Sequence, residues 1–209
     1  MVNVMVAAVF KKDALFFQRL AKSSGLYSGN LDGSWGPLTQ GAADAWDKLS
    51  AATAKTYGTF DPRTEENIAS LVPKAQRAAR QFLVAAKDFP YTVKILSGGR
   101  TYAEQTAIYE QGRSKPGKIV TNAPAGSSNH NFGIAFDVGI FEGKTYFTGE
   151  TKKQNDAYLA LRKLTKPVVR ELDWGGDWKS SKDYPHYELH TGMTTRQVRA
   201  SLEKGIAYV

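Results

Sequence analysis

The chain has 209 residues, of which 42% are hydrophobic and 11% aromatic, and it carries 28 Lys and Arg against 20 Asp and Glu. This composition is typical of a globular protein with room for one ordinary core and a small additional unit. The absence of cysteine excludes disulfides and a thiolate nucleophile, and the formal net charge of +8 favours a polyanionic partner.

The apolar run at residues 4–10 is short and has no basic segment before it, and Lys11 and Lys12 follow it directly. These features make it a poor signal peptide, and it is too short to cross a bilayer. We therefore expect a protein that is made in the cytoplasm without a signal peptide and that has no membrane span.

The next pattern is a turn followed by a helix at residues 32–39. Asp32 and Gly33 predict a turn, Trp35 is expected to anchor that turn in a core, and Pro37 suits the first position of a helix. Helical spacing then predicts one buried stripe, formed by Leu38, Ala42, Ala45, Trp46 and Leu49.

Periodicity is lost between residues 51 and 59, where we place a boundary between two units. The first, at residues 1–55, is expected to be a small domain. The second spans 56–209 and begins at Asp61 and Pro62, which predict an N-cap and the first residue of a helix.

Within the second unit, helices and short strands are mixed, which predicts an α+β fold. A helical stripe is expected to end near Pro90, and its members are Ala75, Ala78, Ala79, Phe82 and Ala86. Val93 and Ile95 then alternate as in a strand, and a capping box at Thr101 and Glu104 starts a helix that stops near Gly112.

Later in the chain, a helix is expected from about Gln154 and is broken or kinked by Pro167. A last helix would be capped by Thr194 with Gln197 and end at Gly205.

His130, Asp137 and His186 have the side chains of a catalytic metal site, and the chain has only 3 histidines. Two imidazoles and one carboxylate are a common protein ligand set for zinc, and they leave a fourth position for water. Asp137 lies in an alternating stretch, so it would share a strand face with small neighbours, where a metal and a substrate have room. Without a metal, His130 would be an ordinary loop histidine and Asp137 a strand-end carboxylate.

Asp183 precedes His186 by three residues, and Pro185 stiffens the link between them. A carboxylate in that place can lie beside a metal site without binding the ion, as a general base must. The alternative is that Asp183 is an ordinary solvated carboxylate in a loop. His190 could be a spare ligand, a partner of a ligand or a surface histidine, and we favour the surface histidine.

From Phe60 to Leu189 the chain resembles the zinc D-alanyl-D-alanine carboxypeptidase and L-alanyl-D-glutamate endopeptidase family, which includes peptidase domains of phage endolysins. Five stretches carry the resemblance in the family's order, namely residues 97–105, 109–113, 115–123, 128–137 and 174–186. The resemblance implies a small antiparallel-sheet peptidase of the hedgehog-like fold.

Residue by residue, the same resemblance implies that zinc is held by His130, Asp137 and His186, and that Asp183 takes a proton from the attacking water. It also implies that Arg100 contacts the substrate, because a planar guanidinium can pair bidentately with a stem-peptide carboxylate or an oxyanion. Two further residues receive weaker roles in positioning the substrate, namely Gln105 and Ser128.

Residues 18–39 resemble a three-helix peptidoglycan-binding module, with its hallmark at residues 32–39. This second resemblance implies that the first unit is a small all-α domain of three helices that binds the wall. The basic residues are scattered and no nucleic-acid motif is present. The anionic cell wall is therefore a better candidate than nucleic acid for the polyanionic partner.

We therefore predict a monomeric phage endolysin that cuts the L-alanyl-D-glutamate bond of peptidoglycan in the periplasm or cell wall. One alternative is a bacterial carboxypeptidase that trims terminal D-alanine. A catalytically silent wall-binding protein with a structural metal and a basic nucleic-acid binder are the remaining alternatives.

Overall fold

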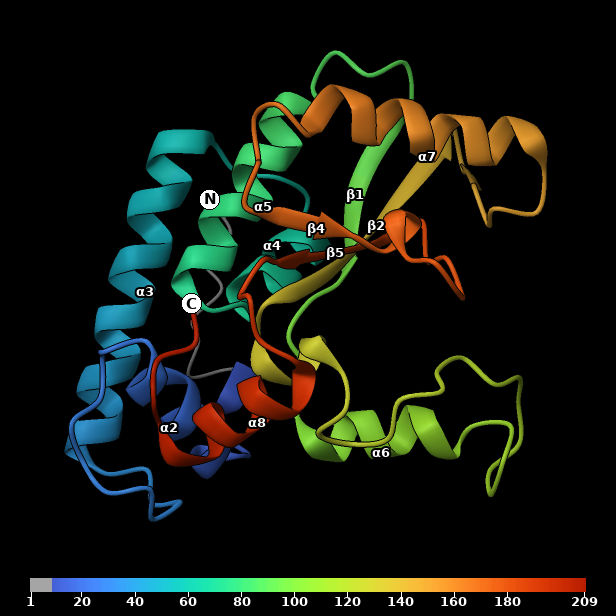
Figure 1. Ribbon diagram of the computed structural model, residues 1–209. Coiled ribbons are helices and arrows are strands. Elements are labelled where there is room, and N and C mark those ends of the chain that lie inside the picture. The colour runs from blue at the N-terminus through green and yellow to red at the C-terminus, as the bar shows by residue number, and fades with distance from the viewer. Residues whose placement is uncertain (1–8) are drawn as a thin grey trace.

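The computed structural model describes residues 9–209 and has the predicted α+β fold (Figure 1). The helical elements are α2 (Ala14–Ser23), α3 (Pro37–Tyr57), α4 (Pro62–Ala69), α5 (Pro73–Ala85), α6 (Tyr102–Glu110), η1 (Asn129–Phe132), α7 (Lys152–Thr165), η2 (Gly175–Asp177) and α8 (Thr195–Lys204). The strands are β1 (Thr92–Ser97), β2 (Ala135–Glu142), β3 (Thr145–Tyr146), β4 (Leu172–Trp174) and β5 (His186–Leu189).

All paired strands of the sheet are antiparallel, in the order β1-β2-β5-β4, and the short β3 pairs with the end of β2. Asp137 of β2 lies opposite His186 of β5 on one side and opposite Ser97 of β1 on the other. The register thus brings together residues that are about fifty positions apart in sequence.

The two faces of β2 have different surroundings, as the alternating sequence predicts. One face is fully buried and contains Phe136, Val138 and Ile140, and Ile134, directly before the strand, is buried as well. On this face the ring of Phe136 packs against Phe82 of α5 and against Tyr187 of β5. The opposite face carries Asp137, whose side chain is 27% exposed. A rigid, packed strand therefore presents the carboxylate on its open side.

Side-chain caps begin several helices where the sequence predicts them. The Asp61 carboxylate accepts a hydrogen bond from the Thr64 amide at the start of α4. Capping boxes start α6 at Thr101 and α8 at Thr194, and α8 ends at Gly205 in the left-handed conformation. These local predictions are confirmed.

The buried stripe predicted for α3 is wrong in part. Leu38 and Leu49 are 65% and 42% exposed, and the buried residues are Thr39, Ala42, Ala43 and Trp46. The inward face is shifted because Thr39 is fixed in the first turn. Its hydroxyl donates to the Ser34 carbonyl and accepts from the buried amide of Gln18.

Helices α2 and α3 pack directly against the rest of the molecule. Helix α3 lies along α5, and α2 contacts α8 from the other end of the chain (Figure 1). The buried core is continuous from Phe17 and Trp46 to Phe82 and Tyr187. Residues 51–57, where we predicted the boundary between two units, are helical and belong to α3. A wall-binding role for the helical N-terminal region stays a prediction.

Of the apolar run at residues 4–10, all but Val9 and Phe10 lies outside the described residues. Between residues 9 and 209, no helix has the length and apolar character needed to cross a membrane.

Candidate metal centre

His130 lies in the short helix η1, which Gly133 ends in the left-handed conformation. Its Nδ1 lies 2.7 Å from the Gly98 carbonyl oxygen. Because a carbonyl only accepts, Nδ1 must carry a proton, so Nε2 is the ring nitrogen that can bind a metal. The Arg100 amide donates to the His130 carbonyl at 2.9 Å, which ties η1 to the loop after β1.

Gly98 and Gly99 are required by the way this loop packs. A Cβ atom on Gly98 would lie 2.2 Å from the Asn67 carbonyl oxygen, and one on Gly99 would lie 2.2 Å from that of Ser70. The loop therefore runs directly against the end of α4, which places the Gly98 carbonyl where His130 needs it.

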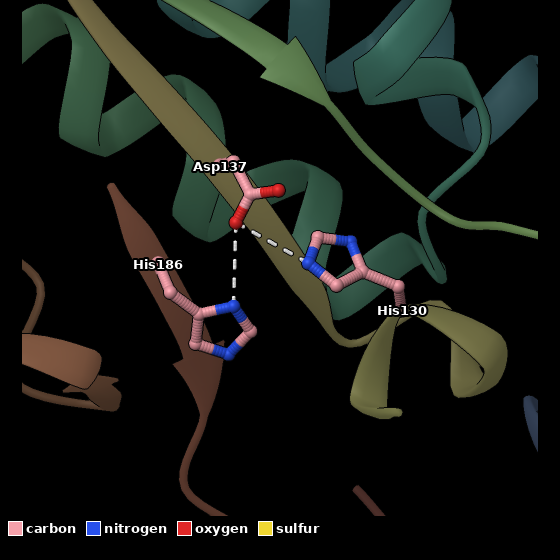
Figure 2. Close-up of side chains that lie close together, drawn as sticks. All are labelled: His130, Asp137 and His186. Atoms are coloured by element: carbon pink, nitrogen blue, oxygen red, sulfur yellow. Dashed lines mark hydrogen bonds and ion pairs between the residues drawn. The ribbon is translucent and has the colours of Figure 1, made fainter. Parts of the chain in front are cut away.

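The three predicted ligands converge on one point (Figure 2). His130 Nε2 and His186 Nδ1 each lie 3.3 Å from the same oxygen, Oδ1 of Asp137. The other ring nitrogen of His186, Nε2, lies 2.8 Å from Oε2 of Glu188. Each imidazole thus has one nitrogen engaged by a protein acceptor and the other directed at Asp137.

Two of the three separations between the ligand atoms fit a tetrahedral metal ion. Donors that lie about 2.0–2.2 Å from a tetrahedral zinc are roughly 3.3–3.6 Å apart, and the two nitrogen to oxygen distances of 3.3 Å match that spacing. The donor set, two imidazoles and one carboxylate, is also one that zinc accepts. The three residues can therefore hold a divalent ion.

The side chains at this site also shift one another's pKa values. Burial alone would raise the pKa of Asp137, but the positive charges and hydrogen bonds of His130 and His186 lower it far below its usual range. Burial alone would lower the pKa of His186, but its hydrogen bonds to Asp137 and Glu188 raise it to about 10. In the metal-free protein at neutral pH, Asp137 is therefore ionised and His186 protonated.

A cavity of about 700 Å³ opens over these residues. Asp137 and both histidines line it, and its walls come from two loops. One wall includes Ile119 and Val120, both more than half exposed, and the other includes Trp178, whose ring lies 5.1 Å from that of His186. The cavity is large enough for several residues of a peptide.

Asp183 lines the same cavity, and the glycine turn before it fixes its place. The Asp183 amide donates to the Gly175 carbonyl at 3.1 Å, and its carbonyl accepts from the His186 amide at 3.2 Å. A Cβ atom on Gly175 would lie 2.4 Å from the Asp183 carbonyl oxygen. Burial, and then the negative charge of Asp137, raise the pKa of the Asp183 carboxyl, although both histidines oppose this. Such a carboxylate is more basic than an exposed aspartate.

Only some of the residues with a predicted role at the substrate line the cavity. Arg100 and Ser128 line the cavity, but Gln105 does not, and its side chain is fully buried. The Gln105 amide donates to the Ala123 carbonyl, and its oxygen accepts from Nη1 of Arg100 at 2.8 Å. Gln105 contacts Arg100 and does not line the cavity, so it cannot position the substrate by direct contact in the way that we predicted. Its position on α6 directs the Gln105 side chain into the protein interior.

Two residues of the site carried no predicted role. Glu188 and Trp178 both line the cavity and contact His186. Strand alternation from His186 places Glu188 on the same face and could have indicated it, whereas no local pattern indicates Trp178. His190 lies on the surface, as we favoured, and its ring pairs with Asp173 at 2.8 Å.

Comparison with known proteins places this site in a family. The sequence profile described as D-alanyl-D-alanine carboxypeptidase matches residues 121–189, which include both histidines and Asp137. The chain is 36% identical over 125 residues to the peptidoglycan L-alanyl-D-glutamate endopeptidase CwlK of Bacillus subtilis (strain 168), in an alignment covering 57% of this chain and 73% of that protein. The chain belongs to the D-alanyl-D-alanine carboxypeptidase family.

Membership in the D-alanyl-D-alanine carboxypeptidase family makes the chain a metallopeptidase and agrees with the ligand set of the site. Among solved structures, the L-Ala D-Glu endopeptidase ChiX of Serratia marcescens is 26% identical, with a TM-score of 0.47. That match covers 64% of this chain and 90% of the other.

Proposed function

We propose that this chain is a zinc peptidase that hydrolyses the L-alanyl-D-glutamate bond in the stem peptide of peptidoglycan. The observation that carries the proposal is the convergence of two imidazole nitrogens on Oδ1 of Asp137 in an open cavity. The bond is suggested by the name of the similar protein from Bacillus subtilis.

His130, Asp137 and His186 would hold the ion, which when bound supplies a Lewis acid that polarises a carbonyl and makes water more acidic. Asp183 lines the same cavity and acts as the general base that removes a proton from the attacking water.

Arg100 directs a guanidinium toward the cavity while Ser97 and Gln105 accept two of its hydrogen bonds. A cation held in this way suits the carboxylate of the D-glutamate residue or the oxyanion formed on attack. Ser128 lies at the start of η1 and can position the substrate from the same side.

Mass spectrometry of fragments released from purified sacculi tests the bond. A new amino terminus on D-glutamate is expected from the parent protein and from the control Asp173→Asn, which changes an exposed carboxylate paired with His190. Release of free D-alanine would instead support a carboxypeptidase, the activity in the family's description. Intact sacculi after incubation with zinc would refute hydrolysis.

We infer further that the chain is a phage endolysin, made in the cytoplasm and acting in the periplasm or wall, whose N-terminal helices bind peptidoglycan. The net charge of +8 and the resemblance at residues 32–39 support this role. Inactive Asp183→Asn protein should sediment with sacculi and be released by salt, and the parent should clear permeabilised cells. Failure to sediment would refute wall binding.

A further inference from the structure

Glu188 occupies a defined place beside the metal centre. It is two residues after His186 in β5, so both side chains project from the same face of the strand. In the sheet, Glu188 lies opposite Ala135, just as His186 lies opposite Asp137. The small side chain of Ala135 leaves room for the carboxylate to fold back toward His186.

One oxygen of Glu188 joins the two elements that carry the histidines. Oε2 accepts from Nε2 of His186 at 2.8 Å and from Nδ2 of Asn129 at 2.8 Å. Asn129 is the first residue of η1 and directly precedes His130. The Glu188 side chain is only 18% exposed, so water competes weakly for these hydrogen bonds.

We propose that Glu188 is a positioning residue of the metal centre, which fixes His186 with its proton on Nε2 and its Nδ1 lone pair directed at the ion. This inference rests on the proposed metal site. A neutral imidazole has two tautomers, and the hydrogen bond made by one nitrogen decides which nitrogen is free to bind a metal.

The two histidines are held by different acceptors. The Gly98 carbonyl, a neutral backbone group, accepts from His130, whereas a carboxylate accepts from His186. A charged acceptor makes the ring a stronger electron donor and adds negative charge near the cation. Of the two histidines, His186 is therefore the one whose affinity for the metal depends on a side chain that a mutation can change.

Glu188 acts through His186 rather than as a ligand. Its carboxylate meets the ring nitrogen that is directed away from Asp137, on the opposite side of the imidazole from the point where the three ligand atoms converge. Removing the carboxylate leaves the three ligands in place but frees the ring to rotate or to change tautomer.

Competition with a chromophoric chelator measures zinc affinity in the parent and in variants. For Glu188→Ala, the affinity should fall about 10- to 100-fold, as for other carboxylates that orient a metal-binding histidine. Glu188→Gln should recover most of the loss, because its amide oxygen can accept the same two hydrogen bonds. Asp173→Asn, on the neighbouring strand β4, should bind like the parent.

Nitrogen NMR of the histidine rings gives an independent readout. Zinc-loaded parent should show His186 protonated on Nε2 and bound through Nδ1, and Glu188→Ala should lose this single pattern. Glu188→Thr, with a side chain that suits a strand, is a second variant should the alanine form fail to fold. It should also lose affinity.

Zinc affinity equal to the parent's in Glu188→Ala or Glu188→Thr would overturn the inference. So would His186 binding through Nε2 in the parent. Failure of the parent itself to bind zinc would instead refute the proposed metal site, so the two failures are distinguishable.

Discussion

At the scale of single residues, the site consists of pairs in which one side chain fixes the state of another. Gly98 and Glu188 each fix the proton of a histidine, and Gln105 fixes the guanidinium of Arg100. Asp183 is held by backbone hydrogen bonds to Gly175 and to the next strand, so its carboxylate stays free for chemistry.

Asp183→Asn should reduce turnover about 10²- to 10⁴-fold, the usual range for loss of a general base. The amide has the same shape but cannot accept a proton. Because Asp183 is not among the three converging ligands, zinc affinity should change little. Release of new amino termini from sacculi measures turnover, and near-parental activity would assign the base elsewhere.

Zinc binding should become tighter as pH rises from neutral toward 10. His186 carries a proton in the metal-free protein because its pKa is raised to about 10, and the metal must displace that proton. Below pH 10 the affinity should rise up to about tenfold per pH unit for this one proton. Asp137, whose pKa is lowered, is already ionised and contributes no such dependence.

Calorimetry in buffers with different ionisation enthalpies measures the number of protons released. At pH 8, release of about one proton from His186 for each zinc bound is expected. An affinity that does not change between pH 7 and pH 9 would contradict it.

At the scale of elements, β2 and β5 supply two ligands through their register, and η1 adds the third. The alternation of β2 and the capped helices could be predicted, because these depend on local patterns. The grouping of His130, Asp137 and His186 was predicted from their residue types and from the family resemblance, because their meeting depends on the sheet register. The inward face of α3 could not be predicted, because Gln18 and Ser34 fix Thr39 across a turn. Likewise, only the packed helix α6 shows that Gln105 is covered.

Gly99→Ala tests the loop between β1 and α6. The added methyl group would lie 2.2 Å from the Ser70 carbonyl oxygen, so the loop must shift and carry the Gly98 carbonyl and Arg100 with it. We expect both lower stability, by roughly 1–3 kcal/mol for an overpacked position, and weaker zinc binding. Thermal unfolding and chelator competition measure the two effects.

Gly41→Ala is the matched control, because a methyl group added there on α3 would have no heavy atom of another element within 4 Å. It should raise stability by up to about 1 kcal/mol and leave zinc binding unchanged. Equal behaviour of the two alanine variants would contradict the role given to the loop.

At the scale of the whole molecule, one core joins the N-terminal helices to the peptidase sheet. Trp46 of α3 is fully buried, and α3 packs along α5. Phe82 of α5 contacts Phe136, which lies on the buried face of β2. The C-terminal segment closes the same core, because the Tyr208 hydroxyl donates to the Phe132 carbonyl at 2.6 Å.

Trp46→Ala should therefore destabilise the entire chain, by about 3–5 kcal/mol for a buried aromatic residue. Hydrogen exchange should increase together in α3 and in β2, because both belong to one cooperative unit. Faster exchange in α3 alone would show that residues 1–55 unfold as a separate domain.

The two loops that wall the cavity, around Val120 and Trp178, lie outside the strands that carry Asp137 and His186. The three metal ligands and the loop around Val120 are thus on different parts of the chain, whereas the loop with Trp178 also carries Asp183. Protein engineers can exploit this division by grafting other sequences into the loop around Val120 while the metal centre stays unchanged, so that a single scaffold yields peptidases with differently shaped cavities.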